Sequence, residues 1–358
     1  MKLNKKDRLE YLRGKFKKLS VNEEGHIEYY TSVKKEYDAL NNGVGIRDVS
    51  DKGKLKLGGK DVSDFLHRIS TNDINSLQDY QQIDTLFTNE KGRIIDETTL
   101  LRMGNEYILI NSAFYREKIK RWLDKYIITE KIAIHDVFSE YTILEIIGPQ
   151  AESFLTLSCG NSIDEIKNGV IISVQIDDLD IKVIKKSHGL LWLMCSSAKY
   201  TQLIDTLLEY VSVFDPEMVG ENAYELYRIE KRTPVAPNEL NDNYNPHEAM
   251  LLDNISFNKG CYIGQEVIAR LDTYDKVQRQ LVEIESDASI DSNGEDILIF
   301  DTKNSDVGKI TSFISSKEYK RNVGLAYIRK DALKNSNKFT AKVQNEHYDI
   351  IVRGKKGR

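Results

Sequence analysis

The segment most suggestive of chemistry is residues 259–266, which read Lys-Gly-Cys-Tyr-Ile-Gly-Gln-Glu. Two glycines in it, Gly260 and Gly264, allow a tight turn. A short helix is predicted directly after this turn, over residues 265–271. Cys261 would then lie just ahead of a helix start, where backbone amides without intrahelical partners carry partial positive charge. We therefore treat Cys261 as a candidate catalytic thiol.

Basic residues flank Cys261 on both sides in the sequence. Lys259 lies two residues before it, and Arg270 would approach if the predicted helix turned its basic face inward. Positive surroundings lower the pKa of a thiol and make the thiolate available for redox or sulfur chemistry. Two alternatives stay open. Cys261 could be a small buried hydrophobe, as free cysteines usually are, and Gln265 and Glu266 could form a first helical turn that merely suits the helix dipole.

The elements that must position this segment alternate along the first 275 residues. Period-two runs of apolar residues predict strands, and apolar residues at helical spacing predict helices. The predicted strands are 44–49, 54–57, 85–87, 98–101, 107–110, 141–147, 170–176, 181–184 and 190–194. The predicted helices are 61–69, 116–126, 150–157 and 198–211. This mixture of βαβ-like groups and hairpins predicts α+β units with mixed sheets.

The pattern changes near residue 276. Beyond it, short strands joined by polar turns are predicted at 280–284, 295–300, 308–312, 321–328, 339–343 and 348–352. Several short strands without a long helix are typical of a small barrel or sandwich. We therefore predict one region over 21–275 and a C-terminal barrel-like domain over 276–358. The Pro- and Asn-rich stretch 234–246 is expected to be a long irregular loop, and such loops are often functional.

The first 20 residues form a basic extension. Lysines and arginines crowd together there, and leucines fall loosely at helical spacing. We expect a short solvated amphipathic helix, in preference to a membrane-surface or targeting segment. The extension lacks the apolar centre and cleavage site of a signal peptide. No window of the chain approaches the ~18 consecutive apolar residues of a membrane-spanning helix.

Composition sets further bounds. A length of 358 residues suggests two or three packed units, and a net charge of −5 offers no general nucleic-acid-binding surface. The three cysteines form no CxxC pair, and the six histidines form no HxxxH or HxH pair. We therefore expect neither a metal site nor a disulfide framework, and a reducing cytoplasm is the expected location.

Several motifs occur in the order of a known superfamily. They are Gly-Ile-Arg-Asp-Val-Ser at 45–50, Ser-Thr-Asn-Asp at 70–73, the hairpin at 87–97, Gly-Pro-Gln-Ala at 148–151, Tyr-Arg-Ile-Glu at 227–230 and Asn-Pro-His-Glu at 245–248. Over residues 29–324 the chain resembles the folate-binding superfamily that contains the glycine-cleavage T-protein and YgfZ. The segment 259–266, together with Arg270, resembles the YgfZ type. T-proteins usually carry Lys-x-Asp-Phe-x-Gly there, without the cysteine.

The resemblance implies a fold and a cofactor. The fold would be α+β, with two interleaved α/β subdomains that form a folate-binding-like ring and a small C-terminal β-barrel. The bound cofactor would be tetrahydrofolate or a derivative. Residues then expected to contact it are Asn111, Arg228, Glu230, Lys259, Gln265 and Arg270. Asn111 would face the ligand, and Arg228 would hold a carboxylate of the folate tail or pair with a buried acid.

Glu97 is the second candidate catalytic residue that the resemblance implies. T-proteins place a carboxylate at this position near the folate nitrogen that accepts the one-carbon unit, where it can orient the ligand or move protons. Here the pair reads Asp96-Glu97, so the carboxylate is one methylene further out. Neighbouring residues of a strand face opposite sides, so only one of the two can enter a cavity. The alternative is an exposed carboxylate on a hairpin.

Two departures from the T-protein pattern bear on activity. The aromatic residue expected about four positions before Asn89 is replaced, since residues 84–88 read Asp-Thr-Leu-Phe-Thr. The glutamate that contacts the pterin in T-proteins corresponds to Leu191, which cannot accept a hydrogen bond from the ring N–H groups.

Three functional hypotheses follow. The first is a YgfZ-like protein that supports iron–sulfur cluster assembly or repair, with Cys261 as the key thiol and iron–sulfur client or assembly proteins as partners. The second is a tetrahydrofolate-dependent aminomethyltransferase of one-carbon metabolism. The third is a binding module that kept the scaffold without catalysis. We expect no direct nucleic-acid or membrane binding. Whether the protein is an enzyme is left open at this point.

Overall fold

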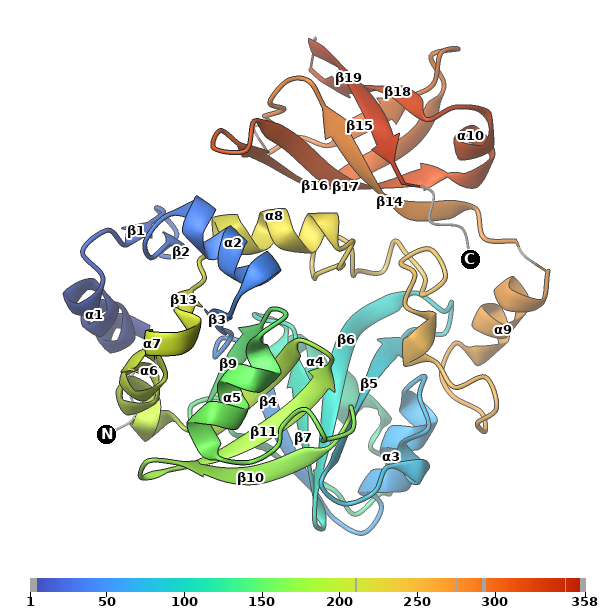
Figure 1. The fold of residues 1–358 in the computed structure, drawn as a ribbon. Helices are drawn as coiled ribbons and strands as arrows, with labels where there is room; N and C mark the ends of the chain where they lie inside the picture. The colour runs from blue at the N-terminus through green and yellow to red at the C-terminus, as the bar shows by residue number, and fades with distance from the viewer. Residues whose placement is uncertain (1–4, 210, 275, 292–293, 345, 355–358) are drawn as a thin grey trace. The chain divides into compact units, whose positions relative to one another are not determined.

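A computed structural model describes residues 5–209, 211–274, 276–291, 294–344 and 346–354 (Figure 1). The chain forms two compact units, and each is discontinuous in sequence. Unit 1 comprises Met1–Leu66, Ile74–Asp84 and Thr98–Tyr224. Unit 2 comprises His67–Asp73, Thr85–Glu97 and Glu225–Arg358. The units are therefore interleaved along the chain.

A six-stranded sheet forms one half of unit 1. Its strands, in spatial order, are β10 (Ile171–Ile176), β11 (Leu179–Ser187), β12 (Leu190–Ser196), β9 (Tyr141–Ile147), β3 (Gly45–Asp48) and β13 (Glu217–Met218). Helices α5 (Ala151–Cys159) and α6 (Tyr200–Glu209) cover one face, and α7 (Val211–Phe214) follows α6. The buried side chains of these helices pack on alternate residues of the strands, so one face of the sheet is apolar.

A second sheet has the order β5 (Gln81–Thr88), β6 (Ile94–Met103), β7 (Glu106–Asn111), β4 (Gly53–Gly58) and β8 (Ala133–Asp136). It is accompanied by α3 (Val62–Ile69), η1 (Ile74–Ser76) and α4 (Arg116–Tyr126). Within unit 1, Leu101 and Ile110 of this sheet share a buried cluster with Ile143 and Trp192 of the first. The two sheets therefore pack on each other through apolar faces.

The N-terminal segment contains α1 (Lys5–Lys15), β1 (Ser20–Val21), β2 (Ile27–Tyr29) and α2 (Val33–Asn42). A helix forms where the sequence predicts one, but it packs on the body of unit 1. Leu12 is buried in the same core as α6. The hydroxyl of Tyr11 donates to Asp205 Oδ1 at 2.6 Å, and Lys15 pairs with the same carboxylate. The helix is therefore docked on unit 1, whereas the sequence predicts a solvated helix.

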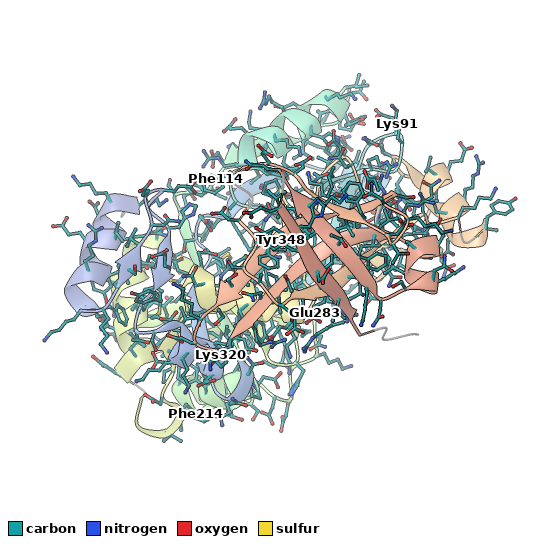
Figure 2. The ribbon with its side chains drawn as sticks, turned by 90° about the horizontal axis from the view of Figure 1, so that it is seen from above. Lys91, Phe114, Phe214, Glu283, Lys320 and Tyr348 are labelled. Atoms are coloured by element: carbon teal, nitrogen blue, oxygen red, sulfur yellow. The ribbon has the colours of Figure 1, made fainter. Side chains whose placement is uncertain are left out.

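Unit 2 contains a closed six-stranded barrel, coloured orange to red in Figure 1. Its order is β14 (Arg279–Ser286), β17 (Arg321–Arg329), β16 (Asp306–Ser316), β15 (Ile297–Phe300), β18 (Lys338–Val343) and β19 (Glu346–Arg353). Figure 2 labels Glu283 on β14 and Tyr348 on β19. Each of the six strands predicted beyond residue 276 corresponds to one barrel strand. The short helix α10 (Lys330–Asn335) was not predicted.

The rest of unit 2 includes the C-terminal half of α8 (Glu221–Glu230), η3 (Leu252–Asn254) and α9 (Gln265–Tyr274). The Pro- and Asn-rich stretch between α8 and η3 has neither helix nor strand, as expected. The architecture is therefore mixed α+β with several sheets and a C-terminal barrel, which confirms the predicted fold class.

Glu36 of α2 ties the N-terminal segment to the chain that precedes α8. Its fully buried carboxylate accepts backbone N–H groups from Tyr30 at 2.7 Å, Thr31 at 2.8 Å and Gly220 at 2.8 Å. Burial nevertheless raises the pKa of this carboxyl to about 7. The ionised form is stabilised by three donors and penalised by the loss of water, and the penalty is the larger effect.

We predict that Glu36 makes stability depend on pH. Because its pKa is about 7 in the folded chain and 4.5 ordinarily, the folded state holds more protons between these values. Its contribution to the unfolding free energy is full below pH 4.5 and falls as pH rises through 7. Denaturant unfolding of wild type and Glu36→Gln should show the wild-type advantage shrinking by about 3 kcal/mol from pH 4.5 to 7.5. A difference independent of pH would refute the assignment.

Candidate functional site around Cys261

Three sequence motifs of unit 2, at 70–73, 87–97 and 259–266, form one cluster although they lie far apart in the chain. Thr71 is its centre. Its hydroxyl donates to the carbonyl of Asn254 at 2.7 Å and accepts from the amide of Leu86 at 3.0 Å. The amide of Ser256 donates to the carbonyl of Thr71 at 3.0 Å. The Ser-Thr-Asn-Asp segment is thus hydrogen-bonded both to the β5–β6 hairpin and to the chain that leads into residues 259–266.

Lys259 anchors the start of the cysteine-containing segment. Its buried ammonium donates to the backbone carbonyls of His67, Ser70 and Asn72, the last two at 2.7 Å. These carbonyls lie around the end of α3, where helical C=O groups lack intrahelical partners and favour a cation. Burial lowers the pKa of Lys259 to about 8, so the ammonium still predominates at neutral pH. The three N–H groups of the ammonium match three backbone acceptors.

Gly264 fixes the other end of the segment against the hairpin. Its φ of +82° lies in the left-handed region, and a Cβ there would come within 2.5 Å of the carbonyl oxygen of Asn89. The hydroxyl of Thr88 donates to the carbonyl of Ile263 at 2.6 Å. Helix α9 then starts at Gln265, where the sequence predicts it, and continues to Tyr274. Only glycine meets both the backbone angle and the close approach at position 264.

Cys261 is the exposed thiol of the chain. Cys195 is buried and Cys159 half-buried. The neighbour of Cys261, Tyr262, packs in a buried cluster with Leu86 and other apolar side chains. Anchors on either side therefore leave the thiol at the surface, four residues ahead of α9. The alternative of a small buried hydrophobe does not describe Cys261.

The remaining predicted residues of α9 are displayed outward. Arg270 is exposed, Glu266 is exposed and Gln265 is half-buried. Lys259 and Arg270 therefore differ: the first is occupied by backbone carbonyls, and the second lies on the surface of the helix. Their assigned roles toward a cofactor stay predictions.

His67 is a neighbour of the thiol segment that the sequence reasoning missed. Its Nδ1 lies 3.2 Å from Asp73 Oδ1, and a Cβ built on Gly260 would lie 4.0 Å from its Nε2. An imidazole oriented by a carboxylate thus adjoins the residue before Cys261. The signal was available, because His67 stands three residues ahead of the Ser-Thr-Asn-Asp motif at the end of a predicted helix.

Glu97 is held in place within unit 2. Its carboxylate Oε1 accepts from the side-chain amide of Asn254 at 2.6 Å, and the side chain is half-buried. Asp96 is fully buried, as expected if adjacent strand residues face opposite sides. Glu97 is thus not a freely exposed hairpin carboxylate. Its catalytic role stays a prediction.

Asn111 ends β7 in unit 1 and carries an unsatisfied group. Its side-chain Nδ2 donates to the carbonyl of Ser112 at 2.9 Å, but its buried Oδ1 has no hydrogen-bond partner among the described residues. The buried hydroxyl of Thr98, directly opposite on β6, also has no hydrogen-bond partner among the described residues. A Cβ at Gly53 would collide with the Asn111 amide, so glycine gives this side chain its space. Two adjacent unsatisfied polar atoms indicate a place for a ligand or for water.

Two roles are predicted for Arg228, binding a folate carboxylate or pairing with a buried acid, and in the structure it pairs with acids. Its fully buried guanidinium forms a bidentate pair with Glu225, at 2.5 and 2.6 Å, and lies 3.3 Å from Glu239. It also donates to the hydroxyl of Ser312 on barrel strand β16 at 2.7 Å. Glu230, two residues further along α8, pairs with Arg321 of β17. Both residues thereby connect α8 to the barrel, and no contact here tests a role in folate binding.

Leu191 belongs to the core of unit 1. It is fully buried in the apolar cluster under α5 and α6. The next residue, Trp192, faces the opposite side of β12 and donates its indole N–H to Glu145 at 3.1 Å. The strand therefore presents Leu191 to the packed interior, where a carboxylate would be strongly destabilising.

A charged pair borders the indole of Trp192. The Lys186 ammonium lies 4.5 Å from the ring centroid, close enough for a cation–π interaction. It is paired with Asp84 and donates to the hydroxyl of Thr99 at 2.8 Å. Asp84 is the first residue of the stretch 84–88, in which the expected aromatic residue is replaced. In this chain a carboxylate–ammonium pair occurs in that stretch.

No three His, Cys, Asp or Glu side chains in the described ranges gather so that they could hold a metal ion. Among the described helices, none is long and apolar enough to cross a membrane.

The chain belongs to the glycine cleavage T-protein family. Residues 11–259 match the GCVT N-terminal domain, and residues 279–355 match the glycine cleavage T-protein C-terminal barrel domain. The chain is 32% identical over 326 residues to "Putative transferase At1g60990, chloroplastic" of Arabidopsis thaliana, which covers 89% of this chain and 73% of that protein. It is 27% identical over 330 residues to an aminomethyltransferase of Caldanaerobacter subterraneus subsp. tengcongensis, covering 90% and 87%.

A solved structure shares the fold. The crystal structure of the glycine cleavage system aminomethyltransferase T from Bartonella henselae aligns with a TM-score of 0.78 at 18% identity, over 92% of this chain and 91% of that one. These comparisons confirm the predicted superfamily. They do not distinguish the YgfZ type within it.

Exposure predicts the order of thiol reactivity. Because Cys261 is exposed whereas Cys195 is buried, brief treatment with iodoacetamide should modify Cys261 first, then Cys159, then Cys195. Peptide mass spectrometry at several short times would measure the three rates. An unmodified Cys261 alongside modified Cys159 and Cys195 would show that the segment is only a structural turn.

Gly264→Ala should destabilise the protein through both strain and collision. Gly294 provides a matched control, because it has the same φ of +82° but no atom within 4 Å of a built Cβ. Alanine at 294 should cost about 1 kcal/mol for the backbone angle alone. Alanine at 264 should cost at least about 1–2 kcal/mol more in denaturant unfolding. Equal losses for the two variants would contradict the close packing on the hairpin.

Proposed function

We propose that the protein is a folate-binding, YgfZ-like member of this family that supports assembly or repair of iron–sulfur clusters, with Cys261 as the working thiol. The observation that carries the proposal is the surface position of Cys261 on an anchored turn. A thiol fixed in this way is accessible to a macromolecular client and needs little reordering to react. Iron–sulfur client or assembly proteins are the proposed partners.

Unsatisfied polar groups support binding of a reduced folate. The pterin ring of folate offers N–H groups beside a carbonyl, and Asn111 Oδ1 is a buried acceptor in need of such a donor. The Thr98 hydroxyl can donate or accept beside it. When bound, tetrahydrofolate would supply a carrier nitrogen for a one-carbon unit. The residues present therefore fit the ring, although Leu191 replaces a carboxylate that T-proteins use for it.

The second candidate is a tetrahydrofolate-dependent aminomethyltransferase. The family relatives that carry that name favour it, because they align with most of this chain. Two features of this chain favour the first candidate instead. By the sequence resemblance, Leu191 corresponds to a ligand-binding glutamate of T-proteins and Cys261 to an aspartate, and in this chain Leu191 is buried in the core whereas Cys261 is exposed. The third candidate from the sequence is a non-catalytic binding module. It differs from the first candidate in requiring no reactive thiol at Cys261.

Replacement of Cys261 should abolish support of iron–sulfur enzymes. In the source organism, with the chromosomal copy replaced by Cys261→Ser, the activity of a [4Fe–4S] dehydratase should fall several-fold. Cys159→Ser is the matched control and should behave as wild type, because that thiol is half-buried and outside the segment. A metal-free dehydrogenase measured in the same extracts controls for general damage. Normal dehydratase activity in the Cys261→Ser strain would eliminate the proposal. Loss of glycine cleavage instead would favour the transferase.

Replacement of Asn111 should weaken folate binding. Calorimetric titration with tetrahydrofolate and 5-formyl-tetrahydrofolate should show at least a tenfold rise in Kd for Asn111→Leu, about 1.4 kcal/mol. Denaturant unfolding measured in parallel separates the two effects, because the variant removes both the unsatisfied oxygen and the hydrogen bond to the Ser112 carbonyl. Cys261→Ser should leave the Kd unchanged. Unaltered affinity in Asn111→Leu would place the ring elsewhere, and no binding to wild type would remove folate from the proposal.

A further inference from the structure

A cavity of about 370 Å³ opens in unit 1 beside the docked helix α1. Much of its wall is apolar. Leu12, Tyr30 and Val219 are nearly fully buried there, and Leu9 and Phe138 also contribute. We call it the α1 pocket. Its volume is near the lower end of the range for small-molecule sites, so it suits one small ligand.

One unpaired cation faces the α1 pocket. Arg8 of α1 lines it, and its buried Nε has no hydrogen-bond partner among the described residues. The guanidinium carbon lies 4.7 Å from the ring centroid of Tyr200, which holds the group in place by a cation–π contact. Arg8 makes no ion pair with any described residue. Arg8 is half-buried, and a guanidinium whose Nε is withdrawn from water is stabilised when an anion completes its hydrogen bonds.

One unpaired anion faces the same space. Asp48, at the end of β3, lines the α1 pocket, and its Oδ1 accepts the amide of Ser50 at 2.9 Å. The Tyr200 hydroxyl is close enough to interact with this carboxylate, and Asp48 makes no ion pair with any residue in the described ranges. The pKa of Tyr30, in the pocket wall, is raised first by burial and second by the negative charge of Asp48, so this charge acts on the interior of the pocket. Asp48 and Arg8 thus present opposite charges to one cavity without pairing with each other.

The other charged groups of the lining are paired or lie at the surface. Arg47 lies 3.1 Å from Glu145 and 3.7 Å from Glu221, so its charge is compensated. Lys5 and Asp51 are exposed. The interior therefore offers one positive and one negative partner. An anion alone would leave Asp48 without a partner, and a cation alone would leave Arg8 without one.

We propose that the α1 pocket binds a small zwitterion, namely an α-amino acid with an apolar side chain. Its carboxylate pairs with Arg8, its ammonium pairs with Asp48, and its side chain packs on Leu12, Tyr30 and Phe138. This site is separate from the cysteine segment and does not depend on the proposed function, because all of its residues belong to unit 1.

Three probes with the same phenyl group test whether binding requires both the ammonium and the carboxylate. They are phenylalanine, 3-phenylpropanoate, which lacks the ammonium, and 2-phenylethylamine, which lacks the carboxylate. Calorimetric titration of the full chain should show phenylalanine binding at least tenfold more tightly than either analogue, since each charged hydrogen-bonded contact contributes more than a neutral one. Equal binding of the three probes, or no binding of phenylalanine at about 10 mM, overturns the proposal.

Two variants identify the partners. Arg8→Gln and Asp48→Asn should each raise the Kd for phenylalanine at least tenfold. Asp51→Asn, at the exposed edge, is the matched control and should bind as wild type. Asn at position 48 can still accept the Ser50 amide, so this variant is expected to fold, and circular dichroism checks both. Unchanged affinity in Asp48→Asn refutes the zwitterion. Cys261→Ser should bind phenylalanine normally, which separates this test from that of the proposed function.

Discussion

The geometry of the site depends on one buried charge, the ammonium of Lys259. It lies among three backbone carbonyls around the end of α3 and holds the segment 259–264 to the Ser-Thr-Asn-Asp motif. Burying an ammonium is costly unless its N–H groups all find acceptors. Here three acceptors are provided by the backbone. Lys259 therefore serves to anchor the segment 259–264, and its positive charge points at backbone carbonyls and not at the thiol of Cys261.

The rest of the turn follows from that anchor. Tyr262 is buried in an apolar cluster, and Gly264 lies against the hairpin backbone where a side chain has no space. Between these fixed points, Cys261 is exposed. The same segment thus combines a rigid backbone with an accessible thiol. His67, oriented by Asp73, adjoins Gly260 and adds a titratable group to the neighbourhood.

The sequence was most informative where a local rule decides the structure. The start of α9 at Gln265 follows from Gly264, and the barrel strands follow from short apolar runs between polar turns. It was least informative where partners come from distant segments. Neither the acceptors of Lys259 in segment 67–72 nor the pairing of Arg228 with Glu239 has a local signature, because these contacts join segments more than 10 residues apart. The docking of α1 through Asp205 is of the same kind.

The central claim is that Lys259 holds the turn that presents Cys261. Amide hydrogen exchange of wild type, Lys259→Met and Cys261→Ser tests it most directly, because exchange reports local opening. We predict faster exchange over residues 259–268 and 88–92 in Lys259→Met, with the barrel strands as protected as in wild type. Cys261→Ser should match wild type throughout. Unchanged protection of residues 259–268 in Lys259→Met would contradict the account.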